Sequence, residues 1–140
     1  MRNQIPDLTI SLFFKNNYLL NNISGAAIYS VPDLILLKVN QKYMDGCNSP
    51  FNKIENSIGR PINDFVTGYV GSPTETAWNS VLEIQKTSYI KELKFEEDER
   101  RTTYWDATKT PIFENGKMRY IFEITTDVTE RVHDKQHIQQ

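Results

Sequence analysis

Two histidines are the residues of this chain that come closest to a metal-binding spacing. His133 and His137 are four residues apart, which puts both on one face of a helix and would suit two ligands of a metal ion. The helical His-Glu-x-x-His pattern is missing, because the residue after His133 is not glutamate. We expect both to lie on a solvated helix surface, and we predict neither a metal site nor a haem held through them.

The remaining chemically reactive side chains do not form a recognisable catalytic set. Cys47 is the only cysteine, so no internal disulfide can form, as is typical of a reducing compartment. Asp106 and Asp127 are a conceivable carboxylate pair for acid–base chemistry, but nothing in the sequence ties them together. The sequence also contains no glycine-rich phosphate loop and no nucleophile elbow. We therefore predict no catalytic residues.

Aromatic side chains are the best candidates for lining a ligand pocket, since indole and phenol rings stack on a ligand and offer it a hydrogen-bond donor. Plain core packing is the commoner role for any one of them. Strand alternation places Tyr104 and Trp105 on opposite faces, so at most one points toward the helices. Ala107 shares a strand face with Trp105 and favours Trp105 as the inward residue, whereas Ile112 shares a face with Tyr104 and favours Tyr104. The sequence does not decide which of the two faces the helices. The candidate lining residues are Phe65, Trp78, Leu82, Tyr89, Tyr104 and Trp105.

The composition is that of one globular domain. Of its 140 residues, 39% are hydrophobic and 11% aromatic, which is enough for a real core. The net charge of −2, with both signs interspersed, argues against the clustered basic surface that nucleic-acid binding needs. No apolar run approaches the ~20 residues of a membrane span, and no signal peptide is recognisable. We expect a cytoplasmic domain that contacts neither nucleic acid nor, through this segment, a membrane.

Two long antiparallel strands organise the C-terminal part of the chain. Asn115-Gly116 suits a type I′ turn, because both residues tolerate positive φ. Residues 102–114 before it are rich in strand-forming types, and residues 117–128 after it alternate. One face of the second strand carries Tyr120, Phe122, Ile124 and Val128, and the other carries Arg119, Glu123 and Asp127.

A helix is predicted to follow the second long strand directly and to leave the body of the domain. Asp127 is the expected N-cap, and Glu130, three residues on, would complete a capping box. Val128, Val132 and Ile138 have a spacing with which a pairing seam between two helices could begin.

Short elements are predicted before the long strands. Strands at residues 26–31 and 34–39 flank a turn, and Asn40 caps a short helix over residues 41–44. Residues 47–56 are read as irregular, with at most one helical turn. A further helix, beginning at residues 7–8, is predicted within the N-terminal leader.

Two more helices and a strand complete the prediction. Pro61 suits the first position of a helix that runs to Tyr69. The next helix has Ser72 as N-cap, Pro73 at its first position and Glu75 at its third, and should run to about Lys86 with Ala77, Trp78, Val81, Leu82 and Gln85 inside. Residues 89–95 form a strand with Tyr89, Leu93 and Phe95 on one side, and residues 96–101 form a charged hairpin loop. The fold class is therefore α+β, with a five-stranded antiparallel sheet and helices packed on one face.

In this order the elements resemble a PAS domain. The most specific match is Thr126-Asp127-Val128-Thr129-Glu130-Arg131, a final strand that passes into a helix. Supporting matches are Val39-Asn40, Ile58-Gly59-Arg60-Pro61-Ile62, Thr110-Pro111-Ile112 and Asn115-Gly116-Lys117. The resemblance covers roughly residues 25–131. It leaves residues 1–24 as a leader and residues 132–140 as the start of a signalling helix.

The resemblance implies a non-catalytic sensor or dimerisation module of a bacterial signalling protein such as a sensor histidine kinase. PAS domains enclose a pocket that holds a small ligand, a haem, a flavin or nothing, and an effector domain would follow residue 140. A homodimer is expected, through the leader or the outer face of the sheet. Two alternatives stay open: a small cavity enzyme of the isomerase or dehydratase type that uses a buried Asp or Tyr, and an interaction module without a ligand.

The light-sensing branch of the family carries a reactive cysteine just after an Ile-Gly-Arg-Asn stretch. Here Pro61 replaces that asparagine, Ile62 stands where the cysteine would be, and Cys47 lies well upstream. We therefore expect no cysteinyl-flavin photocycle.

A helix continued rigidly from the last strand acts as a lever, so a ligand that prefers one sheet conformation would change its position. The candidate signal-transmitting residues at this junction are Asp127, Thr129, Glu130 and Arg131.

Overall fold

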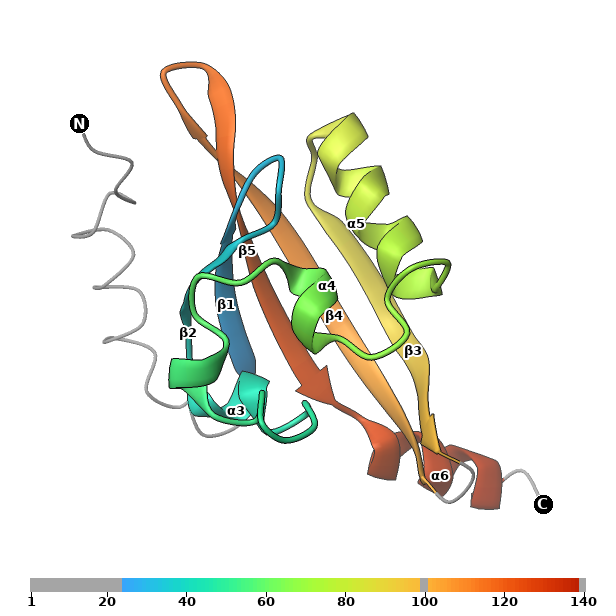
Figure 1. The fold of residues 1–140 in the computed structure, drawn as a ribbon. Coiled ribbons are helices and arrows are strands. Elements are labelled where there is room, and N and C mark those ends of the chain that lie inside the picture. The colour runs from blue at the N-terminus through green and yellow to red at the C-terminus, as the bar shows by residue number, and fades with distance from the viewer. Residues whose placement is uncertain (1–23, 99–100, 139–140) are drawn as a thin grey trace.

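The computed structural model describes residues 24–98 and 101–138, which form one antiparallel five-stranded sheet in the order β2-β1-β5-β4-β3 (Figure 1). This confirms the predicted α+β class. The predicted leader helix lies outside the described residues. The strands are β1 (Gly25–Ser30), β2 (Leu36–Val39), β3 (Ser88–Asp98), β4 (Arg101–Glu114) and β5 (Lys117–Asp127). The helices are α3 (Gln41–Met44), η1 (Ile54–Asn56), α4 (Ile62–Phe65), α5 (Pro73–Ile84) and α6 (Thr129–Ile138).

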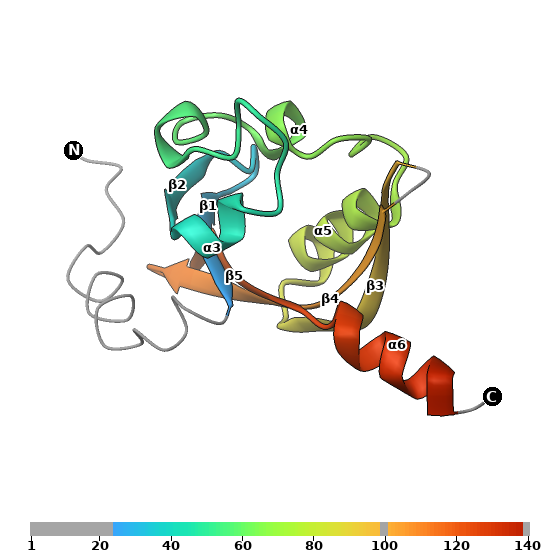
Figure 2. The ribbon, with the colours of Figure 1, turned by 90° about the horizontal axis from the view of Figure 1, so that it is seen from below.

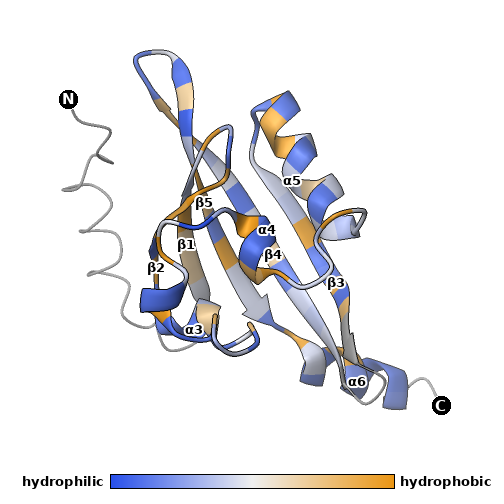
Figure 3. Cartoon of the chain, viewed as in Figure 1, coloured by the Kyte–Doolittle hydropathy of each residue, from blue (hydrophilic) through white to orange (hydrophobic). Residues whose placement is uncertain are grey.

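Helices α3, α4 and α5 lie on one face of the curved sheet, and α6 continues from the end of β5 away from them (Figure 2). The turns of α5 alternate between apolar and polar residues, whereas α6 is mainly hydrophilic (Figure 3). None of the helices within residues 24–98 and 101–138 has the length and apolar character needed to cross a membrane. The three covering helices and the sheet therefore build the interior, and α6 stands apart from it.

The helix-start signals that the sequence indicates are present at α3 and α5. The Asn40 side chain accepts the N–H of Tyr43 at 3.0 Å, and the Ser72 hydroxyl accepts the N–H of Glu75 at 3.1 Å. Pro73 stands at the start of α5. These side chains satisfy N–H groups that the first helical turn leaves without partners. Capping thus fixes where α3 and α5 begin over the sheet.

The segment after Pro61 differs from the prediction. Helix α4 is only one turn long, and Pro61 is its N-cap rather than its first helical residue. Val66 is already extended and Gly68 has φ +69°, so the backbone turns away before the predicted end at Tyr69. Tyr69 is nevertheless buried. Its helical spacing therefore reflected burial, not a continuous helix.

Helix α5 ends slightly earlier than predicted. Gln85 takes the left-handed conformation, with φ 60°, and closes the helix through its N–H to Val81. Gln85 is exposed and does not belong to the inner stripe. Ala77, Trp78 and Val81 are buried as predicted, and Leu82 packs at the margin of the core.

A β-bulge changes which residues of β3 face the helices. Ile90 pairs with Ala107 and Leu93 with Trp105, so β3 has one residue more than β4 over this stretch. Glu92, in the bulge, has φ 56°. Strict alternation therefore fails, and the prediction that places Tyr89 on the face of Leu93 and Phe95 is wrong. The strands also extend into the predicted charged loop, because β3 runs to Asp98 and β4 starts at Arg101.

The predicted alternation of β5 holds from Tyr120 onward, but the register shift at Arg119 interrupts it, so that Met118 packs against the same core as Ile121. The two faces of the strand are also unusual. Ile121 packs in the main core under the helices, and Glu123 is buried on that same side. Tyr120 and Phe122 instead join Ile28 in a second apolar cluster on the opposite face of the sheet. The face of β5 that looks more polar in sequence is thus the one covered by helices.

Candidate functional site

A cavity of about 120 Å³ lies between the covering helices and the inner face of the sheet. Aromatic and apolar side chains dominate its wall, and two charged side chains lie in it. Its lining residues come from α3 and the loop after it, from α4 and α5, and from strands β3, β4 and β5. They are Tyr43, Gly46, Cys47, Asn48, Ile62, Phe65, Val66, Thr67, Thr74, Trp78, Leu93, Phe95, Trp105, Ala107, Lys109, Glu123 and Thr125.

A continuous polar chain runs through the wall of the cavity. Lys109 Nζ lies 3.2 Å from Glu123 Oε2, and the Tyr43 hydroxyl donates to Glu123 Oε1 at 2.6 Å. The hydroxyls of Tyr43 and Tyr29 share a hydrogen bond of 2.5 Å. Lys109 Nζ also sits 5.0 Å from the ring centroid of Trp78, a cation–π distance. Lys109 and Glu123 are only 1% and 4% exposed, so two opposite charges face each other away from water.

Burial and charge together hold these phenols in their neutral form. Burial raises the pKa of Tyr29 and of Tyr43 well above the ordinary value, and the nearby Glu123 carboxylate raises both further. In the described part of the chain, every buried side-chain nitrogen and oxygen has a hydrogen-bond partner. The polar chain is therefore a satisfied network and not a defect of the core.

Local geometry explains how these groups come together. Lys109 and Glu123 are direct cross-strand partners in the β4–β5 ladder, which places their side chains next to each other on one face. Tyr43 reaches them from α3, which the Asn40 cap anchors. Gly25 is needed for this approach, because a Cβ there would lie 2.7 Å from the Cα of Tyr43.

The structure brings together half of the six predicted pocket residues. Phe65, Trp78 and Trp105 line the cavity. Ala107 lines it as well, so the face of β4 that carries Trp105, and not the face that carries Tyr104, points toward the helices. Leu82 packs against the main core and is not among the lining residues.

The other two predicted residues, Tyr89 and Tyr104, do not line the cavity. Tyr89 is 59% exposed, and its hydroxyl bonds Asp106. Tyr104 makes an edge contact with the ring of His133 in α6. Both lie on the far side of the sheet, Tyr89 because of the bulge and Tyr104 by simple alternation.

Sequence reasoning missed Lys109 and Glu123. From the Asn-Gly turn alone, an unbroken ladder would pair Lys109 with Phe122. A register shift between Ile112 and Phe113 moves the pairing by one, so that Lys109 meets Glu123. One signal was available in the sequence: the charged Glu123 shares a strand face with the apolar Ile121, and this indicates a charge on a buried face.

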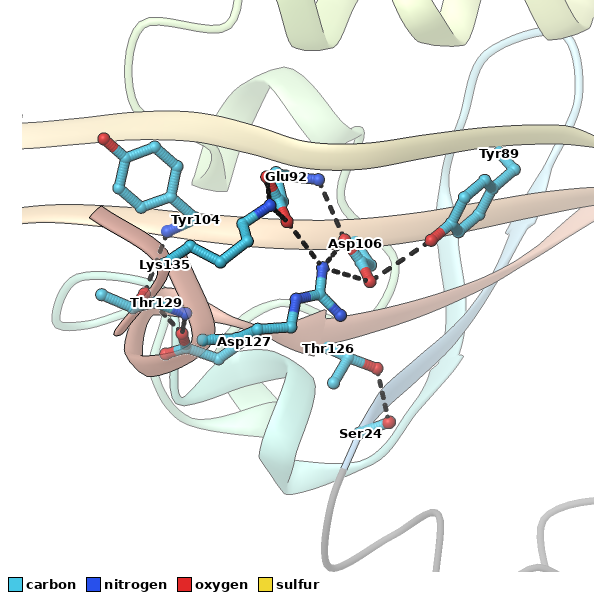
Figure 4. A network of polar contacts seen from close by, with 10 residues as sticks. Ser24, Tyr89, Glu92, Tyr104, Asp106, Thr126, Asp127, Thr129 and Lys135 are labelled. Atoms are coloured by element: carbon cyan, nitrogen blue, oxygen red, sulfur yellow. Dashed lines mark hydrogen bonds and ion pairs between the residues drawn. The ribbon is translucent and has the colours of Figure 1, made fainter. Parts of the chain in front are cut away.

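The start of α6 is tied to β4 (Figure 4). The N–H of Val128 donates to the Tyr104 carbonyl at 2.8 Å, and the N–H of Tyr104 donates to Thr129 Oγ1 at 2.9 Å. Asp127 Oδ1 accepts both the N–H and the hydroxyl of Thr129. In place of the predicted capping box between Asp127 and Glu130, Asp127 binds Thr129, two residues on. The Glu130 side chain is exposed.

Two basic residues of α6 hold the helix against the β3 bulge (Figure 4). Arg131 lies 3.1 Å from both Glu92 and Asp106, and Lys135 lies 2.9 Å from Glu92. The Asp106 carboxylate also accepts the N–H of Glu92 at 2.9 Å, which satisfies the bulged backbone. We call Glu92, Asp106, Arg131 and Lys135 the helix clasp. Of the predicted junction residues, Thr129 and Arg131 connect α6 to the sheet, and Asp127 binds Thr129 at the start of α6.

The clasp shifts the pKa values of its carboxyl groups. The hydrogen bond from Lys135, followed by that from Arg131, lowers the pKa of Glu92 although partial desolvation opposes it. For Asp106 burial acts to raise the pKa, but the N–H of Glu92 and the Arg131 guanidinium outweigh it and the pKa is lowered. Both groups are therefore held in their charged form.

Within residues 24–98 and 101–138, no three His, Cys, Asp or Glu side chains gather as metal ligands. The lining residues include no histidine for a haem. The cavity of about 120 Å³ is also well below the ~300 Å³ at which pockets for larger ligands begin. Cys47 does lie in the cavity wall, which its upstream position did not suggest.

The antiparallel sheet in the order 2-1-5-4-3, with helices over one face and a helix continuing from the last strand, defines a PAS-type domain. The chain belongs to this family: the family model described as the PAS fold matches residues 20–133. No curated protein matches the sequence.

Solved structures agree on the fold. An RNA-binding light-oxygen-voltage receptor is 16% identical with a TM-score of 0.69, and the match covers 98% of this chain and 37% of that one. A sensory box sensor histidine kinase from Vibrio cholerae is 17% identical with a TM-score of 0.58, over 89% of this chain and 96% of that one. The PAS domain of the histidine kinase ThkA is 18% identical with a TM-score of 0.56, over 75% of this chain and 99% of that one.

Proposed function

We propose that this PAS domain is a non-catalytic sensory module that passes the state of its cavity to α6. Three consecutive residues of β4 carry the proposal. Trp105 lines the cavity, while Tyr104 and Asp106 on either side of it bind the start of α6 and Arg131. Because side chains alternate along a strand, one short stretch of backbone contacts the cavity on one face and α6, the exit helix, on the other.

The proposed mechanism is a shift between two arrangements of this stretch. A ligand that contacts Trp105 favours the β4 conformation that suits it, and the Tyr104 and Asp106 contacts with α6 change with that conformation. Reciprocally, a change in the position of α6 alters the affinity of the cavity by the same free energy.

We further propose that α6 leads into a C-terminal effector and that the module acts as a homodimer in bacterial signal transduction. Two of the similar structures are a sensor histidine kinase and the PAS domain of a histidine kinase, which makes a kinase the favoured effector. The apolar cluster on the outer face of the sheet, where Leu37, Ile112 and Phe122 are only half-buried, offers a surface for a second copy.

Hydrogen exchange of the α6 amides tests the proposal. A Trp105→Phe variant changes the cavity wall without adding charge, and we expect it to change α6 protection at least about fivefold, since couplings of 1–3 kcal/mol are typical between linked sites. Phe113→Leu is the matched control, because Phe113 lies on the same strand but is half-exposed and is not among the residues that line the cavity. Equal α6 protection in wild type and Trp105→Phe would reject the proposed transmission.

A further inference from the structure

We propose that the cavity selects a neutral molecule with one aromatic ring and one hydroxyl group, which donates to Glu123 and accepts from Lys109. The inference deepens the proposed function, because it names the class of ligand that the sensory cavity takes. It rests on three independent features of the wall: volume, aromatic lining and charge balance.

The volume fits a single ring. A dry engineered cavity of about 150 Å³ binds benzene, and one water needs only ~10–15 Å³. At about 120 Å³ the cavity lies close to the first value and several times above the second. A fused three-ring system would need side chains to move apart, whereas one six-membered ring with a small substituent needs little rearrangement.

The wall is suited to an aromatic ring. Tyr43, Phe65, Trp78, Phe95 and Trp105 contribute rings from both the helices and the sheet. Aromatic pairs in offset or edge geometry are stabilised beyond the effect of the area that they bury. The indole N–H of Trp105 already donates to Thr103 at 2.9 Å, so this side chain presents mainly its apolar surface.

Charge balance excludes an ionised ligand. Lys109 and Glu123 already neutralise each other, and both are almost fully buried in the cavity wall. A carboxylate ligand would place a second negative charge beside Glu123, and an ammonium ligand a second positive charge beside Lys109. Either one leaves a net buried charge, which strongly disfavours binding.

The ion pair nevertheless has unused hydrogen-bonding capacity. An ammonium has three donors, and Lys109 is shown to spend one on Glu123 while Trp78 covers it on another side. A carboxylate has about four acceptor sites, and the Glu123 carboxylate is shown to use two, for Lys109 and Tyr43. A single hydroxyl can accept from the first group and donate to the second.

The test compares phenol, toluene and benzoate, three probes of one ring that differ in hydroxyl and charge. Binding is followed through the indole N–H resonances of Trp78 and Trp105 during titration. We expect phenol to bind about five- to tenfold more tightly than toluene, as one net hydrogen bond provides, and benzoate to bind more weakly than both. Tighter binding of benzoate than of phenol, or binding of none of the probes, would overturn the inference.

Two variants make the test specific. In the double variant Lys109→Met/Glu123→Met, apolar side chains replace the pair, a change that buried ion pairs often tolerate. We expect it to keep toluene binding and to lose the preference for phenol, and a retained preference contradicts the inference. Ala107→Leu, which fills the cavity, should abolish binding of all three probes.

The two proposals fail in different ways. If phenol binds as expected but α6 protection does not respond to Trp105→Phe, the sensory function fails and the ligand class stands. If α6 responds but benzoate is the preferred probe, the ligand class fails and the sensory function stands.

Discussion

Single residues set the chemistry of the cavity. Lys109 and Glu123 carry opposite charges and are almost fully buried, and the desolvation of two such ions commonly exceeds their mutual attraction. Their geometry limits this cost, because Tyr43 and the Trp78 ring complete their contacts. The pair therefore adds little to the net stability of the fold. Its main effect is to provide one polar contact site in an otherwise apolar cavity wall.

Removing one member of the pair should be far worse than removing both. Lys109→Met leaves the Glu123 carboxylate buried with only Tyr43, and we expect a loss of about 3–5 kcal/mol in the free energy of unfolding. The double variant Lys109→Met/Glu123→Met should unfold within about 1–2 kcal/mol of wild type. Urea denaturation measures both, and a single variant that is no less stable than the double one would show that the pair is not isolated from water.

The buried phenols predict a loss of stability at high pH. Burial, followed by the charge of Glu123, raises the pKa of Tyr29 and Tyr43 well above the ordinary value, and burial raises that of Tyr69 to about 12. Tyrosines of the unfolded chain ionise near pH ~10, so this stabilisation is complete below that pH and is lost as the pH rises through the folded values. Tyrosinate absorbance for these residues should appear together with unfolding. Their ionisation near pH ~10 in a folded domain would contradict the burial.

At the scale of elements, α6 is docked rather than free. The Val128 and Thr129 bonds to Tyr104 fix its start, the helix clasp fixes its next turns, and Val132 is buried. The predicted outgoing helix is present, but the sheet holds its first turns through groups that also stabilise the β3 bulge. Under the proposed function, a signal would act by loosening this contact.

Acid should release the clasp. Because the pKa values of Glu92 and Asp106 are lowered in the folded state, their contribution is present above the ordinary carboxyl range near pH ~4 and is lost as the pH falls through the lowered values. We expect the protection factors of α6 amides to fall between about pH 4 and pH 2, while those of β5 persist. The double variant Glu92→Gln/Asp106→Asn should lack this transition, and an identical transition in that variant would refute the assignment.

Local signals allowed most of the elements to be predicted. The Asn40 and Ser72 caps and the positive φ of Asn115 and Gly116 depend on neighbouring residues only, and the sequence carries them. The cavity depends on register. One bulge reverses the side that Tyr89 faces, and one shift beside Phe113 brings Lys109 opposite Glu123. Such one-residue shifts follow from packing across the sheet, and no pattern within a single strand specifies them.

At the scale of the whole molecule, the domain is a curved sheet with a cavity on one side and its exit helix at one end (Figures 1 and 2). Strands β4 and β5 belong to both parts, since they line the cavity and then meet α6. The cavity and α6 therefore share two strands of the sheet, and under the proposed function these strands carry the coupling between them.

The proposed homodimer is a prediction at this scale. Sedimentation velocity over a range of concentrations should show a dimer, and Phe122→Glu on the outer apolar cluster should weaken it at least about tenfold, because a charge would be buried in the interface. A domain that stays monomeric at high concentration would remove the claim.

The central claim is that the cavity wall and α6 are energetically coupled, and a double-mutant cycle measures that coupling directly. The cycle combines Trp105→Phe in the cavity with Arg131→Gln in the clasp and compares the free energies of unfolding of the four proteins. We expect the two changes to deviate from additivity by at least about 0.5 kcal/mol. Additivity within about 0.3 kcal/mol would contradict the account, because the cavity and the exit helix would then be independent.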